Sequence, residues 1–467
     1  MSTPPQSNGD GATSSLLARR DGAAILHPYS DAVSTSANGP LVLTQGNGIY
    51  VTDENGNTYI EGMSGLWCVS LGFGNTRLAN AATQQIQKLS FYHGFNQKGH
   101  DANIELAERL LKAAPVPMAR VFFANSGSEA NDTAVKLIWY FNNALGRTKK
   151  KKIIGRIKGY HGVTIASGSI TGTPINHTSF DLPLDRFLHT DFPHYARESN
   201  PGETEEAFAS RCAENLERLI IREGPETIAA FFAEPVMGAG GIIMPPKGYF
   251  EKIQTVLKKY NILMVADEVI TGFGRTGNYW GSQTFGVAPD ILTCAKALSS
   301  GYIPISAVLI SHEIFQTVAQ KSHDLEVFGH GFTYSGHPVS AAVALETLKI
   351  YEEMDILGHV KKIAPLLKKG IDSFGDHPIV GEVSAVGLLA VAELISDKTS
   401  LKPFPPEKKV GAHLIQKALG KGLILRNFGD RIGFCPPLII NPDEISELFV
   451  RFGKALDETM DWATNRG

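Results

Sequence analysis

The sequence contains little cysteine for its length. Its 467 residues include only Cys68, Cys212, Cys294 and Cys435, which lie far apart and lack the paired spacing of zinc sites or redox motifs. We therefore expect free thiols in a reducing compartment rather than a disulfide framework. The histidines also lack metal-ligand spacing such as H-E-x-x-H, so no metal site is predicted.

Long apolar runs and a net charge of one sign are also missing. The best apolar run, VGLLAVAELI, contains a glutamate and stays well short of the roughly 20 residues that span a bilayer. Lys and Arg number 44 against 47 Asp and Glu, which argues against nucleic acid or an anionic membrane surface as a partner. The opening MSTPPQSNGDGATSS lacks the features of a signal or transit peptide. We expect a disordered or extended arm over residues 1–24 and a cytoplasmic location.

The chain does contain an alternation of amphipathic helical patterns with short apolar runs. Between about residues 100 and 310 these runs are ARVFFAN, KIIGRI, TIAAFFAEPV, ILMVADEVI, ILTCAK and ISAVLIS. The alternation predicts an α/β fold with a parallel sheet covered by helices on both faces. From about residue 340 a second, smaller α/β domain is expected, joined by the N-terminal region in which GNGIYVTDENGNTYIEG is typical of a hairpin.

Several of the apolar runs end in a polar or charged residue: Asn125, Glu234, Asp267 and Lys296. In parallel sheets ligands bind beyond the carboxyl ends of the strands, so these side chains are candidates for one site. A carboxylate at the end of a buried strand is costly unless it meets a cation or hydrogen-bond donors. We therefore expect a positive group to face Asp267.

A short Ser-Gly-Ser stretch, Ser126, Gly127 and Ser128, stands between a predicted strand and a predicted helix. Free N–H groups at a helix start, with the serine hydroxyls and the helix dipole, can hold a phosphate. An ordinary helix N-cap is the competing interpretation.

The stretch GFGRTG at residues 272–277 matches the dinucleotide-binding fingerprint letter for letter. That fingerprint requires a helix that opens at the glycines, but here the Gly-rich NYWGSQTFG follows. A dinucleotide-dependent dehydrogenase is therefore rejected. The sequence also has no G-x-S-x-G elbow, which argues against a serine hydrolase.

A phosphate site, a buried aspartate and a strand-end lysine together are what pyridoxal 5'-phosphate requires. Lys296 would form the Schiff base, and Asp267 would keep the pyridine nitrogen protonated so that the ring acts as an electron sink. Tyr160, in KGYHG directly after a predicted strand, is placed to stack on the ring.

From about His27 to its end the chain resembles the class III pyridoxal-phosphate aminotransferases of fold type I. It is most similar to the ω-amino acid:pyruvate or amine:pyruvate group. The motifs FANSGSEAND, GYHG, AEPVMGAGG, ADEVITGFGRTG, AKALSSGYIPISAV and GFTYSGHP occur in the order of that family. The resemblance implies a large cofactor-binding domain over 76–335 with a seven-stranded, mostly parallel sheet. It implies a small domain over 336–467, to which residues 25–75 are joined.

The resemblance also implies roles for individual residues. Lys296 and Asp267 would be catalytic, with Lys296 moving the proton between the substrate Cα and the cofactor C4′. The active unit would be a homodimer with shared active sites, or a tetramer formed from two dimers. The cofactor-binding residues would be Ser126, Gly127 and Ser128 at the phosphate, Thr333 at the phosphate of the partner subunit, Val269 and Tyr160 on the ring, and Glu234 in the surrounding hydrogen bonds.

Substrate recognition is implied at Ala239, Arg426 and three pocket-wall residues. Family members that act on ornithine or 4-aminobutyrate commonly have a glutamate, able to pair with a mobile arginine, where this chain has Ala239. Arg426 would clamp the carboxylate of an amino or keto acid and swing out for other substrates. Leu66, Trp67 and Phe95 match the apolar walls of the ω-type enzymes, although core packing also explains them.

The function predicted is a ping-pong transfer of an amino group from an ω-amino acid or primary amine to a small keto acid, with pyruvate as the expected acceptor. An aminomutase or a decarboxylating aminotransferase of the same family is the alternative, because either would share Lys296 and Asp267. A catalytically inactive relative that only binds ligands is disfavoured, because both residues and the phosphate loop are retained.

Overall fold

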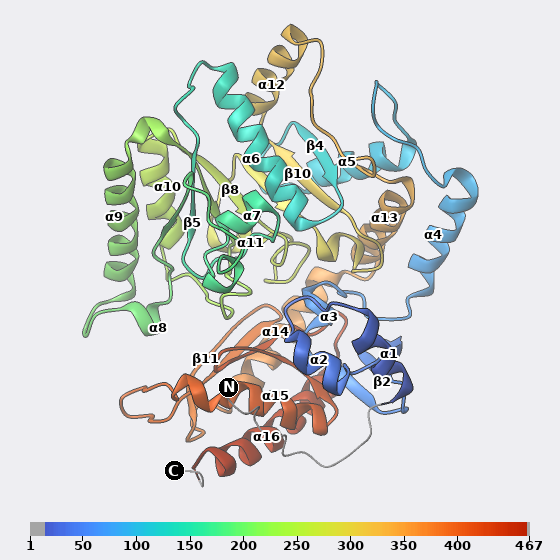
Figure 1. Cartoon of the computed structure of the whole chain (residues 1–467), viewed down its shortest axis with the longest axis vertical. Coiled ribbons are helices and arrows are strands. Elements are labelled where there is room, and N and C mark those ends of the chain that lie inside the picture. The colour runs from blue at the N-terminus through green and yellow to red at the C-terminus, as the bar shows by residue number, and fades with distance from the viewer. Residues whose placement is uncertain (1–14, 465–467) are drawn as a thin grey trace.

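The computed structural model describes residues 15–464, and a seven-stranded sheet organises its larger lobe (Figure 1). The strand order is β4-β10-β9-β8-β7-β5-β6. The strands are β4 (Arg120–Ala124), β5 (Lys152–Arg156), β6 (Phe187–Thr190), β7 (Ile228–Ala233), β8 (Leu263–Asp267), β9 (Ile291–Cys294) and β10 (Ser306–Ile310). All pairs are parallel except those that β10 makes with β9 and β4. The predicted α/β class and mostly parallel seven-stranded sheet are confirmed.

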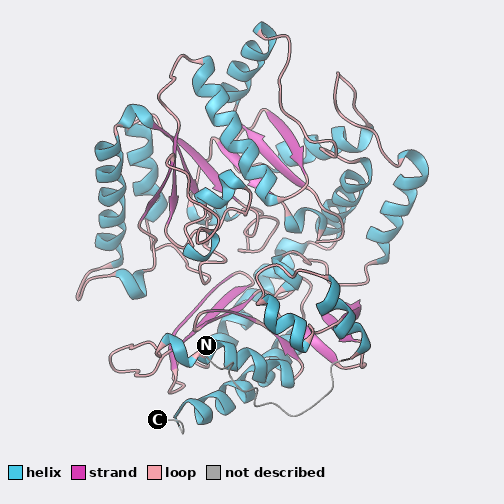
Figure 2. Ribbon diagram, viewed as in Figure 1, coloured by secondary structure: helices cyan, strands magenta, loops and turns pink. Residues whose placement is uncertain are grey.

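Helices cover both faces of this sheet, as Figure 2 shows. Side chains of β7 point alternately to the two faces, so that Phe231 packs in one cluster and Phe232 in the other. The Phe231 face is covered by α9 (Glu205–Glu223) and α10 (Tyr249–Lys259). The Phe232 face is covered by α6 (Gly127–Ala144), α7 (Ile165–Ile170) and α12 (His312–Asp324). Burial on both faces explains why these strands are continuous apolar runs.

The smaller lobe is built on an antiparallel sheet with the order β11-β12-β15-β14. Its strands are β11 (Val380–Val386), β12 (Leu389–Leu394), β14 (Arg426–Phe428) and β15 (Arg431–Phe434). The helices that pack with it are α14 (Ile356–Asp372), α15 (Val410–Gly420) and α16 (Pro442–Thr464). Phe452 of α16 contacts Phe374 and Phe434 edge-on, and these contacts hold the helix to the sheet.

A third sheet joins the N-terminal region to the C-terminal part of the chain. The predicted hairpin is present as β2 (Tyr50–Asp53) and β3 (Thr58–Glu61), with β1 (Leu43–Asn47) beside β2. Strand β13 (Leu423–Ile424) pairs in parallel with β3. Residues far apart in sequence therefore share one small sheet. The domain limits expected from the sequence, at residues 25–75, 76–335 and 336–467, stay a prediction.

The expected disordered or extended arm over residues 1–24 is wrong for its second half. Residues Leu16–Ala24 form helix α1, which packs against α2 (Ala32–Asn38). Ser15 caps α1 by accepting a hydrogen bond from the Ala18 N–H (3.0 Å), and Ala18 is buried. Packing against a second helix, which composition does not reveal, explains the difference. Residues 1–14 of the expected arm lie outside the described residues.

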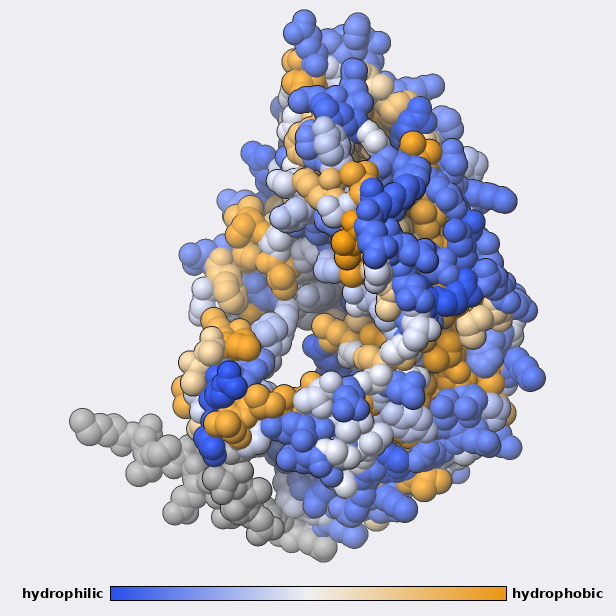
Figure 3. Space-filling view, turned by 90° about the vertical axis from the view of Figure 1, so that its right-hand side faces the viewer, coloured by the Kyte–Doolittle hydropathy of each residue, from blue (hydrophilic) through white to orange (hydrophobic). Residues whose placement is uncertain are grey.

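The remaining elements complete the described chain. They are α3 (Ser64–Trp67), α4 (Thr76–Leu89), α5 (Asp101–Ala113), α8 (Tyr195–Glu198), α11 (Gly281–Phe285), α13 (Pro338–Glu353) and the 3-10 turns η1 (Pro174–Asn176), η2 (Pro225–Thr227), η3 (Lys296–Ser299) and η4 (Pro406–Lys408). Among them, α13 and η3 contribute to the main hydrophobic core. From residue 15 to residue 464, no helix has both the length and the apolar character needed to cross a bilayer. The molecule is hollowed between the lobes (Figure 3).

Candidate active site

A cavity of about 700 Å³ lies beyond the carboxyl ends of the central strands. It brings together most of the residues that the sequence singled out. Those that line it are Leu66, Trp67, Gly127, Ser128, Tyr160, Glu234, Ala239, Asp267, Val269, Lys296 and Arg426. These residues come from seven separate stretches of the chain, so only the fold assembles them.

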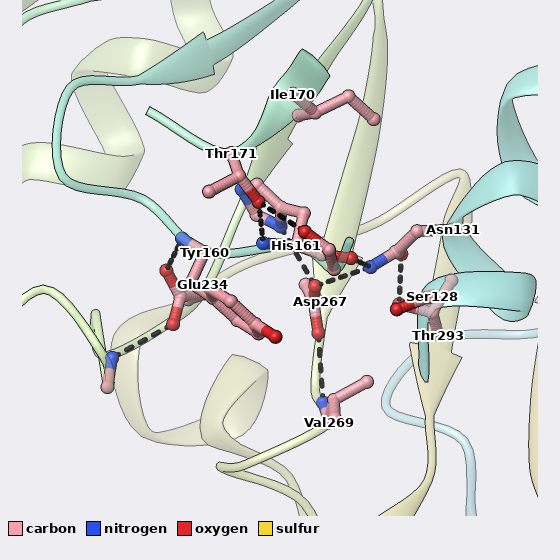
Figure 4. A network of polar contacts seen from close by, with 12 residues as sticks. Ser128, Asn131, Tyr160, His161, Ile170, Thr171, Glu234, Asp267, Val269 and Thr293 are labelled. Atoms are coloured by element: carbon pink, nitrogen blue, oxygen red, sulfur yellow. Dashed lines mark hydrogen bonds and ion pairs between the residues drawn. The ribbon is translucent and has the colours of Figure 1, made fainter. Parts of the chain in front are cut away.

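Asp267 ends β8 and is 4% exposed, and its two carboxylate oxygens have different surroundings (Figure 4). Oδ2 accepts a hydrogen bond from Asn131 Nδ2 (2.8 Å) and lies 2.8 Å from His161 Nδ1. Within residues 15–464, Oδ1 accepts only from the Val269 N–H, at 3.1 Å. Thr293 Oγ1 in turn donates to Asn131 Oδ1 at 2.9 Å. The carboxylate is thus held in one orientation, with Oδ1 left able to accept from a further donor.

Neither lysine nor arginine pairs with Asp267 among residues 15–464. A buried carboxylate that lacks a lysine or arginine partner is expensive, so the site suits a ligand that supplies a positive donor. His161 and Asn131 take part in this arrangement although the sequence did not assign them to it. Asn131 lies one helical turn beyond Ser128 on α6, and that spacing was the one available signal for it.

Lys296 begins the turn η3, two residues after β9 ends, and lines the cavity. Its backbone φ of 48° is left-handed, which for a residue other than glycine costs roughly 1–3 kcal/mol. Within the described part of the chain, no hydrogen bond or ion pair engages its amine. Burial lowers the pKa of Lys296, while the charge of Asp267 acts in the opposite direction. A lower pKa leaves more of the amine unprotonated and therefore nucleophilic.

The Ser-Gly-Ser stretch forms the start of α6, and both sequence interpretations apply to it. Ser126 is the N-cap, accepting from the Glu129 N–H at 3.2 Å, and it does not line the cavity. Gly127 and Ser128, in the first turn, do line it. A Cβ on Gly127 would stand 3.2 Å from Val269, so a larger residue would crowd the cavity wall. The helix N-terminus therefore presents free N–H groups to the cavity.

Glu234 ties together two loops that border the cavity. Its Oε1 accepts from the Tyr160 N–H (3.0 Å) and its Oε2 from the Gly238 N–H (2.9 Å). Burial raises the pKa of Glu234, with the charges of His161 and Arg156 acting in the opposite direction. Because both oxygens are already bonded to backbone, Glu234 fixes the loops that carry Tyr160 and Ala239.

The apolar wall rests on α3, which is kinked at Gly65 and Leu66. Trp67 is 3% exposed and packs on Phe428 of β14, with ring centroids 5.8 Å apart. Leu66 is 54% exposed. The Glu61 side chain accepts a hydrogen bond from the Gly65 N–H, which stabilises the kinked backbone at Gly65.

Arg426 also lines the cavity, and Phe428 lies next to both it and Trp67. The Arg426 guanidinium lies 5.5 Å from the ring centroid of Phe428, and no carboxylate pairs with it among the residues the structure describes. A cation that lines a cavity and has no carboxylate partner is suited to bind the carboxylate of a substrate.

Besides Ser126, two predicted site residues do not line the cavity. Phe95 is 44% exposed and Thr333 is exposed, and neither lines the cavity of this chain. They lie on neighbouring loops, since a Cβ on Gly331 would touch the Phe95 ring at 3.1 Å. Conversely, Tyr29 lines the cavity and was missed. Its hydroxyl accepts from Asn176 Nδ2, a contact between distant segments that no sequence pattern indicates.

The cavity fits pyridoxal phosphate on features of this structure. Lys296 offers an amine without a hydrogen-bonding partner in residues 15–464, and Asp267 offers one under-used oxygen. Gly127 and Ser128 offer a helix N-terminus that a larger residue at Gly127 would obstruct. These residues would hold, respectively, the aldehyde, the pyridine nitrogen and the phosphate.

The fold and this cavity define a pyridoxal-phosphate-dependent transferase of fold type I. The family model Aminotransferase class-III matches residues 32–456. The chain therefore belongs to the class III aminotransferase family, and its cofactor is pyridoxal phosphate.

Relatives and solved structures agree with this family. The chain is 51% identical to gamma aminobutyrate transaminase 3, chloroplastic, of Solanum lycopersicum, over 94% of this chain and 84% of that protein. It is 51% identical to gamma-aminobutyrate transaminase 1, mitochondrial, of Oryza sativa subsp. indica, over 94% and 85%. The omega transaminase of Pseudomonas jessenii in complex with PMP superimposes with a TM-score of 0.95 at 52% identity, covering 97% of this chain and 100% of that one.

Replacing Lys296 is expected to remove the covalent attachment of the cofactor. In Lys296→Ala the phosphate and ring contacts remain, so the cofactor is still expected to bind, but without the visible absorbance band of its lysine-bound form. Turnover should fall below detection, because Lys296 is the group predicted to move the proton. Absorbance and mass spectrometry after borohydride reduction check this, and wild-type turnover would refute the assignment.

Glu61 is expected to make stability depend on pH. Burial raises its pKa from 4.5 to about 8 in the folded protein. Between these values the folded protein keeps a proton that the unfolded chain has lost, so the free energy of unfolding falls as pH rises. Glu61→Gln removes this pH dependence, so the free energy of unfolding of the variant should rise relative to that of wild type as the pH increases from about 5 to about 8.

The measurement is the midpoint of chemical denaturation across that pH range. Glu407→Gln, at an exposed position, is the matched control. If the difference between wild type and Glu61→Gln stays constant with pH, the carboxyl group does not titrate as described.

Proposed function

We propose that this aminotransferase moves the amino group of an ω-amino acid or primary amine to pyruvate by a ping-pong mechanism. The observation that carries the proposal is Arg426, a cation without a carboxylate partner among the described residues, which lines the same cavity as Leu66 and Trp67. Such a site binds a carboxylate at one side and an apolar chain at the other. Gamma-aminobutyrate, named in the relatives, is itself an ω-amino acid and falls within this donor class.

When bound, pyridoxal phosphate would supply an electron sink that stabilises negative charge at the amine-bearing carbon of the substrate. Asp267 would hold the proton on the pyridine nitrogen. Lys296 would move a proton from the amine-bearing carbon of the substrate to the cofactor, and in the opposite direction when a keto acid is the substrate. Tyr160 and Val269 would contact the ring, and Arg426 would orient the substrate by its carboxylate.

The proposed assembly is a homodimer with shared active sites, or a tetramer of two such dimers. Thr333 and Phe95 are exposed and lie outside the cavity of their own chain, which suits residues that complete the site of a partner subunit. We also retain the cytoplasm as the proposed location, although relatives carry chloroplastic and mitochondrial in their names.

An aminomutase or a decarboxylating aminotransferase would use the same Lys296 and Asp267. Product analysis distinguishes these reactions, because an internal shift of nitrogen or release of carbon dioxide is incompatible with simple transamination.

The test of the proposal follows the cofactor absorbance through both half-reactions. Addition of β-alanine is expected to bleach the visible band, and addition of pyruvate to restore it with formation of alanine. A band that is bleached but restored only by a different keto acid would contradict the choice of pyruvate, while keeping aminotransfer.

Removing the guanidinium is expected to separate substrates by their carboxylates. Arg426→Ala should raise the concentration of pyruvate or β-alanine needed for half-maximal reaction by about tenfold or more, the worth of a charge-assisted hydrogen bond. Propylamine, which has a methyl group in place of the carboxylate of β-alanine, should be affected far less. Equal losses on both donors, measured by stopped-flow absorbance, would contradict the clamp role.

A further inference from the structure

A buried cluster of charged groups lies behind the cavity, around Arg431 at the start of β15. Its side chain is 9% exposed, and Nη1 donates to Glu382 Oε2 (2.6 Å) and Glu393 Oε2 (3.1 Å). His194 Nε2 lies 3.1 Å from the same nitrogen and 2.9 Å from Glu382 Oε2. Although burial acts in the opposite direction, the His194 hydrogen bond and the Arg431 charge hold the pKa of Glu382 at about 2.

The cluster is not a metal site. The ligand atoms of His194, Glu382 and Glu393 lie within 4.8 Å of one another, close enough to share an ion. Arg431 Nη1 already contacts all three, so a guanidinium supplies the positive charge that a metal would bring.

Arg431 also reaches the loop that carries Ala239. Its Nε donates to the Gly241 carbonyl at 2.9 Å. Gly241 has a φ of +114°, and a Cβ there would stand 3.0 Å from Arg431 Cδ. The arginine therefore lies directly against this backbone, two residues beyond Ala239 in the cavity wall.

The same residue belongs to the hairpin that carries Arg426. Strands β14 and β15 pair so that Phe428 stands opposite Arg431, and Arg426 opposite Gly433. Phe428 in turn packs on Trp67 and lies beneath the Arg426 guanidinium. Arg431 thus connects the β14–β15 hairpin, which carries Arg426, with the loop that carries Ala239.

We propose that Arg431 is a positioning residue that sets Arg426 and Ala239 at the separation a carboxylate-bearing substrate requires. Glu382 and Glu393, on the small-lobe sheet, fix the position of its guanidinium. The hydrogen bond from Arg431 to the Gly241 carbonyl then fixes the loop that carries Ala239 relative to that sheet. The inference rests on the proposed function, in which Arg426 binds the substrate carboxylate. Without the Gly241 bond the hairpin and the loop can shift relative to each other, and only substrates bound at both sides are affected.

Arg431→Lys is the deciding variant. Lysine keeps the positive charge beside the two glutamates, but its single nitrogen cannot occupy both the Nη1 position at the glutamates and the Nε position at the Gly241 carbonyl. In half-reactions followed by cofactor absorbance, the half-saturating concentrations of β-alanine and pyruvate are expected to rise about five- to tenfold, the effect of one lost hydrogen bond. The value for propylamine should change less than about twofold, and the absorbance spectrum of the bound cofactor should stay the same.

Arg451→Lys is the matched control. Arg451 also joins a carbonyl, that of Gly422, to a carboxylate, that of Glu447, but it does not line the cavity. This variant should leave the ratio between β-alanine and propylamine at its wild-type value. Glu382→Gln gives an independent check, because weaker anchoring of Arg431 should produce a smaller shift of the same selectivity.

Equal shifts for β-alanine and propylamine in Arg431→Lys, or no shift in either Arg431→Lys or Glu382→Gln, would overturn the positioning role. If Arg426→Ala separates the two donors and Arg431→Lys does not, only this inference fails. If Arg426→Ala itself does not separate them, the carboxylate clamp fails and the positioning role fails with it.

Discussion

The Asp267 carboxylate, buried at the end of β8 and held on one oxygen by Asn131 and His161, is the constraint on which the site depends. Taking a carboxylate out of water costs several kcal/mol unless donors replace the water, at roughly one donor per lone pair. The fold supplies these donors to Oδ2 from α6 and from the loop after β5. Among residues 15–464, Oδ1 has one backbone hydrogen bond, so this oxygen can accept from a positive donor on a ligand.

The other parts of the site are arranged around that demand. Lys296 lies at the end of the neighbouring strand β9, because parallel strands bring their carboxyl ends to one edge of the sheet. Glu234 uses both carboxylate oxygens to tie the Tyr160 loop to the Gly238 turn, so the walls of the cavity are fixed by backbone hydrogen bonds. Substrate recognition lies farther out, where the small-lobe hairpin with Arg426 meets the large-lobe loop with Ala239.

Much of this could be predicted from the sequence because strand-end polar residues follow continuous apolar runs. Asp267, Lys296 and the start of α6 were found in this way, together with the parallel sheet. The antiparallel direction of β10 was not predicted, because an apolar run such as ISAVLIS does not indicate whether the strand pairs in parallel or antiparallel. The helix α1 escaped prediction because it is stabilised by packing on α2.

Contacts between distant segments were equally out of reach. The Arg431 cluster joins residues 194, 241, 382, 393 and 431, and no local pattern relates them. Arg275 of the rejected GFGRTG stretch is fully buried and donates to the Pro436 carbonyl, which gives that motif a structural place without a dinucleotide.

The central claim is that Asp267 keeps a proton on the pyridine nitrogen of the bound cofactor. The most direct test is nitrogen-15 NMR of the enzyme loaded with cofactor labelled at that nitrogen, recorded for wild type and for Asp267→Asn. The account predicts a protonated nitrogen in wild type across neutral and mildly alkaline pH, and an unprotonated nitrogen in the variant. An unprotonated nitrogen in the wild-type enzyme, or no difference between the two proteins, would contradict it.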